Sequence, residues 1–179
     1  MDSQRGGRKG RVLDEAALWE YALRALAARA QSVADLREKV RRRAARAADA
    51  DAVLSRLKRY GLLNDQRFAE SYATARVENQ GFGKGRVLRD LRQRRVASKV
   101  AQQVTDAVFE GRDEVQLIED FLKRKYRKVA LNAHLAEPKN LAGAYRKLRY
   151  AGFSSGNSTR VLRRYSEMAD QLEDLEEEP

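Results

Sequence analysis

Apolar residues recur along the chain at the spacing of one face of an α-helix rather than in the alternation of a half-buried β-strand. Two such sets are Leu36, Val40 and Ala44, and Phe68, Tyr72 and Ala75. Alanine, leucine, arginine, glutamate and lysine, which favour helices, dominate the composition, and only two prolines occur. The pattern predicts an all-α protein.

Residues typical of helix ends divide this pattern into nine predicted helices. Ser32, Asn64 and Ser98 stand where a side chain can accept a hydrogen bond from a helix N-terminus. Gly61 and Gly152 stand where glycine commonly ends a helix. The helices are predicted near residues 14–29, 32–46, 49–60, 64–79, 84–95, 98–109, 112–131, 138–151 and 155–172.

Three segments with the same order of apolar and basic residues indicate an internal repeat. Residues 36–41, 87–92 and 144–149 all have apolar residues at the first and fifth positions and an arginine at the sixth. The number of residues from one segment to the next is the length of three helices with their turns. This spacing favours tandem three-helix repeats in an elongated, curved body over one irregular bundle. The predicted parts are a basic disordered tail at 1–12, repeats at 13–62, 63–110 and 111–166, and an acidic C-terminal tail at 167–179.

The charge is strongly basic and unevenly distributed. The chain has 37 Lys and Arg against 26 Asp and Glu, a net charge of +11, yet residues 166–179 contain acids and no base. A basic body concentrates polyanions, among which the phosphate backbone of nucleic acids is the commonest. Solubility alone is the alternative explanation of the charge. The acidic end is interpreted as a solvated terminus or as a competitor of nucleic acid for the basic body.

The residues needed for catalysis or metal binding are not found in the sequence. Cysteine is absent, and the single histidine, His134, lies in a polar stretch without a second ligand. The glycine-rich segment 81–85 lacks the ending and preceding strand of a phosphate-binding loop, so a turn is expected, although backbone N–H groups after it could still meet a phosphate. We expect no enzyme, metal or cofactor, no membrane span and a cytoplasmic location.

Arginines on the outer helix faces are the candidate binding residues. They are Arg41, Arg42, Arg89, Arg92, Arg146 and Arg149. Three of them, Arg41, Arg92 and Arg149, occupy the position shared by all three repeats and should face solvent. A planar guanidinium suits phosphate and carboxylate partners, whereas the alternative is an ordinary solvated face. The aromatic residues stand mostly at core spacing, so stacking platforms for nucleic-acid bases are not expected.

In the segment 61–96, Asp65, Arg67, Phe68 and Ala69 form an acid-x-Arg-Phe-Ala motif, and Gly81 and Gly83 flank an aromatic residue. This segment resembles the RecX family of regulators of the bacterial RecA recombinase. The family has an acid-x-Arg-Phe-Ala segment followed by a Gly-aromatic-Gly turn. The first repeat matches a separate family pattern, Ser-x-x-acid-Leu-x-x-Lys-Leu, at Ser32, Asp35-Leu36 and Lys39-Val40, and Gly152-Phe153 ends the third repeat as the family does. The matching residues of the central motif are Asp65, Arg67, Phe68, Ala69, Tyr72, Arg76, Gly81, Gly83 and Arg86. Departures from the pattern are Asn64, Lys84, Ala44 and Arg95, the last two of which replace glycines that end helices. These motif residues are expected to be structural, with Phe68 buried and Arg67 paired with an acid or a helix end.

The resemblance implies a monomer of three tandem three-helix repeats that binds the RecA filament on single-stranded DNA. It also implies a negative modulator of the ATPase, strand-exchange and coprotease activities of RecA in DNA repair, homologous recombination and the SOS response. The alternative drawn from charge and helical composition is a nucleic-acid-binding module that acts directly on DNA or RNA. Weak direct binding to DNA is left open beside the filament.

Overall fold

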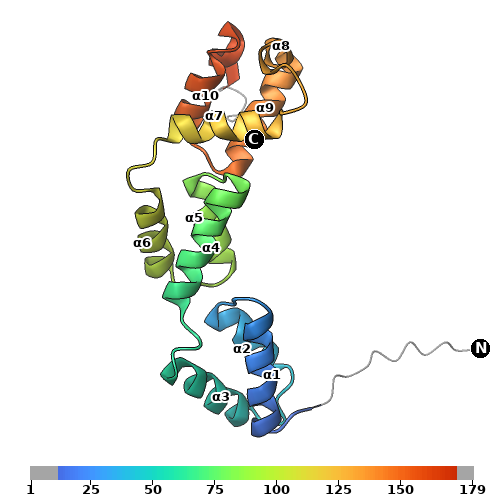
Figure 1. The fold of residues 1–179 in the computed structure, drawn as a ribbon, viewed down its shortest axis with the longest axis vertical. Coiled ribbons are helices and arrows are strands. Elements are labelled where there is room, and N and C mark those ends of the chain that lie inside the picture. Colours follow the sequence, from blue (N-terminus) through green and yellow to red (C-terminus); the bar gives the residue numbers. More distant parts are fainter. Residues whose placement is uncertain (1–11, 173–179) are drawn as a thin grey trace, which may run out of the picture. The chain divides into compact units, whose positions relative to one another are not determined.

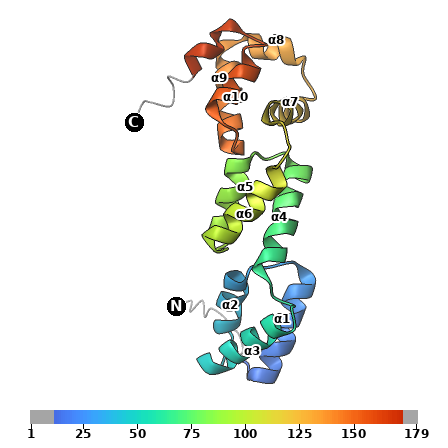
Figure 2. The same cartoon turned by 90° about the vertical axis from the view of Figure 1, so that its left-hand side faces the viewer.

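The computed structural model describes residues 12–172, and the side chains of residues 12–170 (Figures 1 and 2). Over this range the chain forms ten α-helices and one 3-10 helix and no β-strand, which confirms the all-α prediction. Most of the predicted tails, residues 1–11 and 173–179, lie outside the described residues. The elements are α1 (Glu15–Ala28), α2 (Val33–Arg41), α3 (Ala47–Arg59), α4 (Asp65–Gln80), α5 (Lys84–Gln93), α6 (Ser98–Phe109), α7 (Glu114–Lys125), α8 (Leu131–Ala136), α9 (Pro138–Ala151), α10 (Ser155–Leu162) and η1 (Glu167–Leu172).

Contacts divide the chain into two compact units. The first contains the residues up to Phe68 together with Arg94–Val96, and the second contains Ala69–Gln93 and the residues from Ala97 onward. In the first unit α1, α2 and α3 pack on one another around a core. Its fully buried members include Leu18, Leu36, Val40 and Leu57.

The N-termini of α2 and α4 are fixed by side-chain caps that the sequence predicts. Ser32 Oγ accepts a hydrogen bond of 3.0 Å from the Asp35 N–H and begins α2, as predicted. The Asn64 side chain accepts one from the Arg67 N–H and begins α4, also as predicted. The prediction for Ser98 is wrong, because Ala97 occupies the cap position of α6.

Helix α2 is shorter than predicted and ends at Arg41. The chain then runs beside the residue that precedes α1: the Leu13 N–H donates to the Arg43 carbonyl at 2.7 Å, and the Ala45 N–H donates to the Leu13 carbonyl at 2.9 Å. Ala44 therefore lies at the edge of the core in an extended pairing instead of on a helix. Hydrogen bonding to a distant segment has replaced the last helical turn.

The buried face of α4 is rotated from the one that the sequence predicts. Ala69, Ala73 and Val77 are buried at a spacing of four residues, whereas Ala75 is exposed and Tyr72 only partly buried. The prediction was wrong at Ala75 because alanine fits either a buried or an exposed face.

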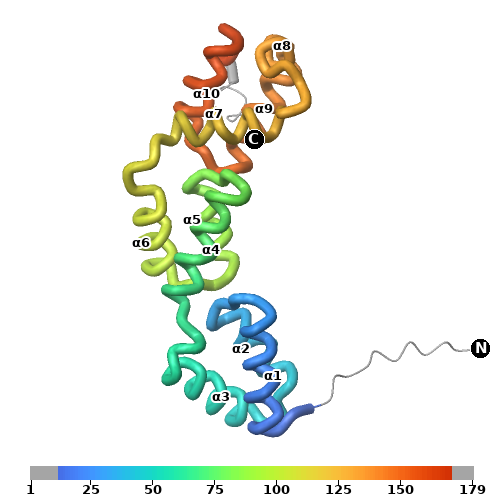
Figure 3. The backbone as a smooth tube through the Cα atoms, viewed as in Figure 1, coloured from blue at the N-terminus to red at the C-terminus, as the bar shows by residue number. Residues whose placement is uncertain are grey.

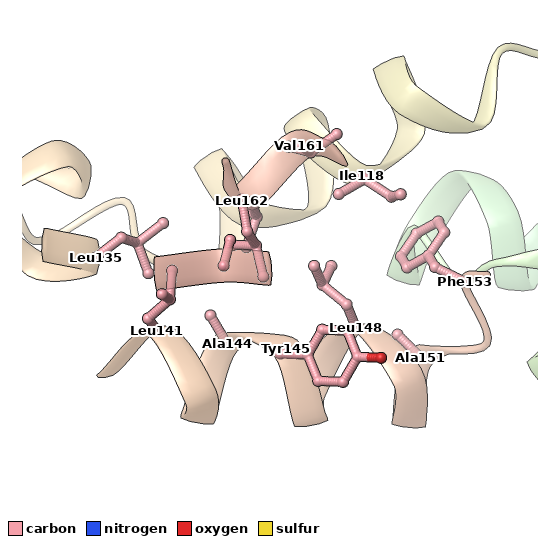
Figure 4. Close-up of a cluster of buried hydrophobic side chains, with 12 residues drawn as sticks. Ile118, Leu135, Leu141, Ala144, Tyr145, Leu148, Ala151, Phe153, Val161 and Leu162 are labelled. Atoms are coloured by element: carbon pink, nitrogen blue, oxygen red, sulfur yellow. The ribbon is translucent and has the colours of Figure 1, made fainter. Parts of the chain in front are cut away.

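The C-terminal helices of the second unit pack around a continuous apolar core. Figure 4 shows Tyr145, Leu148 and Ala151 of α9 on one side and Ile118 and Phe153 on the other. The third triplet departs from the predicted helices in two places. The segment after α7 contains the additional short helix α8, and α10 ends at Leu162 before η1, as the backbone trace in Figure 3 shows.

Candidate functional site

The Gly-Phe-Gly turn between α4 and α5 is hydrogen-bonded to the C-terminal end of α9. The Gly83 N–H donates to the Ala151 carbonyl at 2.8 Å, and the Gly85 N–H donates to the Gly152 carbonyl at 3.0 Å. A Cβ at Gly83 would lie 2.7 Å from the Gly152 carbonyl carbon, so only glycine fits there. These two N–H groups have partners within the protein and are therefore not available to a phosphate.

A buried carboxylate joins two of the three arginines of the family motif, Arg76 and Arg86. Asp90 is 5% exposed. Its Oδ1 accepts from Arg86 Nε at 2.8 Å, while Arg76 Nε lies 3.5 Å from its Oδ2. Arg76 also donates to the Tyr72 hydroxyl. The motif residues therefore hold α4 and α5 together through a charged pair that is shielded from water, as a structural role requires.

The Arg86 guanidinium also stacks on two aromatic rings. It lies 5.3 Å from the centroid of Phe82 and 4.4 Å from that of Tyr150. Tyr150 is 67% exposed. A hydrogen bond from Arg86, and then its positive charge, lower the pKa of the Tyr150 hydroxyl below its usual value. Arg86 thus anchors an aromatic ring that is open to solvent on its other side.

Beside this ring lies a groove of about 1070 Å³ within the second unit, hereafter the α7–α9 groove. One wall is the solvent-facing side of α9, and the other comes from the end of α7 and the segment that follows it. Phe82 of the Gly-Phe-Gly turn closes one end. The lining residues are Gln80, Phe82, Phe121, Arg124, Lys125, Tyr126, Arg127, Lys128, Val129, Gly143, Arg146, Lys147, Tyr150 and Ala151.

The lining of the groove contains six cations and, among the described residues, no acid. Arg124 donates to the Asn79 carbonyl at 3.2 Å, and Lys147 donates to the Tyr126 hydroxyl at 3.0 Å. The other four form no ion pair with any described residue, and all are exposed. They are Lys125, Arg127, Lys128 and Arg146.

Of the six arginines predicted as binding residues, two lie in a basic depression of the first unit. Arg41 and Arg42 line it together with Arg37 and Arg95, and its single acid, Glu38, lies 3.3 Å from Arg95. Arg41 is exposed but also forms an ion pair of 3.0 Å with Asp51. The depression has a volume of about 470 Å³.

The other four predicted arginines lie in the second unit. Arg89 and Arg92 are exposed on α5, and Arg146 lines the α7–α9 groove. The positive charge of Arg89 is a smaller contribution to the lowered pKa of Tyr150, and Arg89 does not line the groove. Arg149 is only partly exposed and donates to the Phe153 carbonyl, so the prediction that it faces solvent is wrong. It holds the end of α9 instead.

The remaining motif residues have separate structural roles. Asp65 accepts a hydrogen bond of 2.8 Å from the Val33 N–H and thereby supports the start of α2. Phe68 is 8% exposed, so its predicted burial is confirmed. The side chain of Arg67 is exposed and forms no ion pair with any described residue, so the expected pairing is wrong. Gly81 adopts a φ of +66°, which favours glycine.

Sequence reasoning missed most of the α7–α9 groove. The signal was the run Lys123-Arg124-Lys125-Tyr126-Arg127-Lys128, a basic cluster of the kind that binds polyanions. Predicting a helix to residue 131 spread these side chains around its circumference, whereas α7 ends at Lys125. The expectation that aromatic residues lie at core spacing is wrong for Tyr150 and for Tyr60, which is 58% exposed.

Comparisons with known proteins identify the class. Residues 64–104 match the family description "RecX, second three-helix domain". A regulatory protein RecX of Trichlorobacter lovleyi is 33% identical over 105 residues, 59% of this chain and 68% of the relative. That of Syntrophotalea carbinolica is 26% identical over 137 residues, 76% of this chain and 88% of the relative.

Solved structures show the same fold. The crystal structure of RecX from Lactobacillus salivarius matches with a TM-score of 0.64 at 17% identity, covering 85% of this chain and 96% of that one. A crystal structure of regulatory protein RecX has the same TM-score at 19% identity and covers 82% of this chain and 70% of that one. Sequence and fold together define a helical regulatory protein built from three-helix units. The chain belongs to the RecX family.

The described residues contain neither a membrane-spanning helix nor a cluster of metal-ligating side chains. None of the helices in that part of the chain is both long and apolar enough to cross a membrane. Across residues 12–172, histidine, aspartate and glutamate side chains form no group that could hold a metal ion.

Proposed function

We propose that the protein is a negative regulator of the RecA recombinase. It binds the RecA filament on single-stranded DNA as a monomer and inhibits ATP hydrolysis, strand exchange and coprotease activity during DNA repair and the SOS response. Membership of the RecX family is the observation that carries this proposal. The central motif supports it further, because the ion pairs and glycine contacts that it makes here maintain the fold on which a family function depends.

The proposed filament contacts are the exposed arginines Arg41, Arg42, Arg89, Arg92 and Arg146. Guanidinium groups on helix faces suit carboxylates and phosphates, both of which a protein–DNA filament presents. Arg149 is not among the proposed contacts because its guanidinium is bound to the Phe153 carbonyl. Each exposed charge pair contributes about 1 kcal/mol or less, but contacts carried on one chain act together.

The direct test is the DNA-dependent ATPase of RecA. We expect inhibition at amounts of this protein well below one copy per RecA protomer, with a matching loss of strand exchange. A pull-down should recover the protein with RecA only when single-stranded DNA and ATP are present. Unchanged ATPase and strand exchange at equimolar protein would overturn the proposal.

A charge-reversal variant tests the proposed contacts. Arg42→Glu, Arg89→Glu and Arg92→Glu combined should weaken inhibition and flatten its salt dependence, because three phosphate or carboxylate contacts are lost. Arg41 is left unchanged because a glutamate there would repel Asp51. The matched control changes three exposed cations on α3, α6 and α10, namely Lys58→Glu, Lys99→Glu and Arg160→Glu. Equal inhibition by the two triple variants would remove these arginines from the proposed contacts.

A further inference from the structure

We propose that the α7–α9 groove is a binding site for single-stranded nucleic acid, with phosphates on its exposed cations and a base stacked on Tyr150. The site lies wholly within the second unit, between the end of α7 and α9. This groove would bind nucleic acid without any recombinase present. Its binding can therefore be tested independently of the proposed regulation of RecA.

Charge is the first argument for the groove. Elsewhere in the described chain, basic side chains are repeatedly matched by acids: Arg41–Asp51, Arg46–Asp49, Lys84–Asp106, Arg94–Asp35, Arg95–Glu38, Arg163–Asp170 and Arg164–Glu119. Cations without an ion pair to a described residue, such as Arg42, Arg67 and Arg92, also occur elsewhere, but in the groove six cations line one concave surface whose described lining contains no acid. A concave surface lined by one sign of charge concentrates the opposite charge from solution. The expected occupant is therefore a polyanion.

The spacing of the cations fits a chain of charges rather than one anion. Gly143, Arg146, Lys147 and Tyr150 lie three and four residues apart, so they form one continuous face of α9 over two helical turns. Lys125, Arg127 and Lys128 form the facing wall. An extended nucleic-acid backbone, with one phosphate per nucleotide, can contact both walls of the groove at several points.

Aromatic rings are the second argument, and they select nucleic acid over other polyanions. The Tyr150 ring is 67% exposed and is held from one side by Arg86, whose guanidinium carbon lies 4.4 Å from the centroid. Tyr126 is fixed by the hydrogen bond and cation–π contact of Lys147, 4.9 Å from its centroid. Rigid aromatic rings beside a basic groove are the common arrangement by which proteins stack unpaired bases.

Gly143 is a third, independent indication. Glycine inside a helix weakens it relative to alanine, so a packing reason is expected. Here a Cβ at position 143 would meet no atom within 4 Å. The protein interior therefore does not require this glycine, and it lies on the groove surface, where the absence of a side chain lets a ligand backbone approach α9.

The exposed ring of Tyr150 favours a single strand over a duplex. Bases of a duplex are already stacked on their neighbours and cannot reach a tyrosine on the groove wall, whereas unpaired bases can. An acidic peptide would satisfy the cations but would gain nothing from the aromatic ring. Single-stranded DNA and RNA share the chemistry in question, so oligothymidylate and oligouridylate serve as separate probes.

The experiment measures fluorescence anisotropy of a labelled oligothymidylate titrated with the full chain, with no RecA present. The comparison probes are oligouridylate, a DNA duplex of the same length and polyglutamate. We expect saturable binding of the single strands and weaker binding of the duplex. Each cation on a single-strand phosphate contributes about 0.7 to the slope of log affinity against log salt.

Two groove variants separate the roles of charge and ring. Combining Arg127→Ala, Lys128→Ala and Arg146→Ala should reduce affinity roughly tenfold or more and lower the salt slope by about 2. Tyr150→Ala should reduce affinity roughly tenfold with an unchanged salt slope, while Tyr150→Phe, which keeps the ring, should retain most of the affinity. The charge-matched control for the triple variant, at exposed positions outside the groove, is Lys58→Ala, Lys99→Ala and Arg160→Ala.

Gly143→Ala provides a test in which stability and binding move in opposite directions. The substitution should raise the melting temperature, because alanine favours the helix and meets no atom, yet it should weaken oligothymidylate binding. Melting temperatures of all variants identify any that fail to fold. Equal loss of affinity in the groove and control triples would overturn the proposal. Polyglutamate bound as tightly as oligothymidylate, with Tyr150→Ala unaffected, would instead make the groove an acidic-peptide site.

Discussion

The backbone nitrogen of Arg86 occupies the space beside Gly152, only 2.0 Å from where a Cβ on that glycine would stand. Gly152 also has a φ of +91°, in the left-handed region that favours glycine. Gly152 therefore both ends α9 and allows the start of α5 to pack against the end of α9. Since both conditions exclude a side chain, the contact between these elements depends on this glycine.

We expect Gly152→Ala to lower the free energy of unfolding by more than about 2 kcal/mol, because left-handed strain adds to the clash with Arg86. Urea denaturation followed by circular dichroism measures the change. Gly156→Ala is the matched control, as a Cβ there meets nothing within 4 Å. It should raise stability by about 0.5 kcal/mol through helix propensity. Similar stabilities of the two variants would contradict the proposed packing.

Neighbouring motif residues should differ sharply in their effect on stability. Phe68 is 8% exposed, so Phe68→Ala should cost about 3 kcal/mol by leaving a cavity. Arg67 is exposed without an ion pair to the described residues, so Arg67→Ala should change stability by less than about 0.5 kcal/mol. Thermal unfolding of both variants checks the pair. A large loss in Arg67→Ala would show that this side chain is anchored after all.

Arg95 has a φ of +56°, which is strained for any residue except glycine. Arg95→Gly should therefore raise the free energy of unfolding by about 0.5 kcal/mol, even though it loses the exposed ion pair with Glu38. Arg95→Ala keeps the strain and loses the same ion pair, so it should be less stable than the parent chain. Chemical denaturation ranks the three proteins, and an alanine variant as stable as the glycine variant would refute the strain argument.

Glu114 makes stability depend on pH in the acid range. Burial by itself raises its pKa, but hydrogen bonds from the side chains of Ser154 and Asn157 and from the Ser154 N–H outweigh burial and hold the pKa below its usual value. A carboxyl group with a lowered pKa in the folded state stabilises the fold above its unfolded pKa, about 4.3 for glutamate. This stabilisation is lost as the pH falls through the folded pKa.

Glu114→Gln should therefore be less stable than the parent near neutral pH, and the difference should shrink as the pH is lowered below about 4. Melting temperatures measured from neutral pH down into the acid range test this. Glu78→Gln, at an exposed position on α4, removes one carboxylate without these hydrogen bonds and serves as the control. A constant difference between Glu114→Gln and the parent at every pH would rule out ionisation as the cause.

The sequence alone determined the helical class, most helix positions and several helix ends. These features depend on contacts within a few residues: Ser32 and Asn64 bond to N–H groups three positions ahead, and Gly152 follows the helix that it ends. The family resemblance rested on the same local motifs. Phe68 is buried, and Arg76 and Arg86 form ion pairs with Asp90, as a structural role of these motif residues would require.

Tertiary structure decided what depends on distant segments. Helix α2 ends at Arg41 because residues 43–45 pair with Leu13, and Arg149 turns inward because the Phe153 carbonyl accepts its hydrogen bond. The α7–α9 groove forms only where α7 stops and α9 packs alongside, with Tyr150 held by Arg86. Periodicity gives the direction of a side chain on its own helix. It contains no information on which neighbour covers that side chain or which carboxylate neutralises it, and these contacts determine which cations remain free for a ligand.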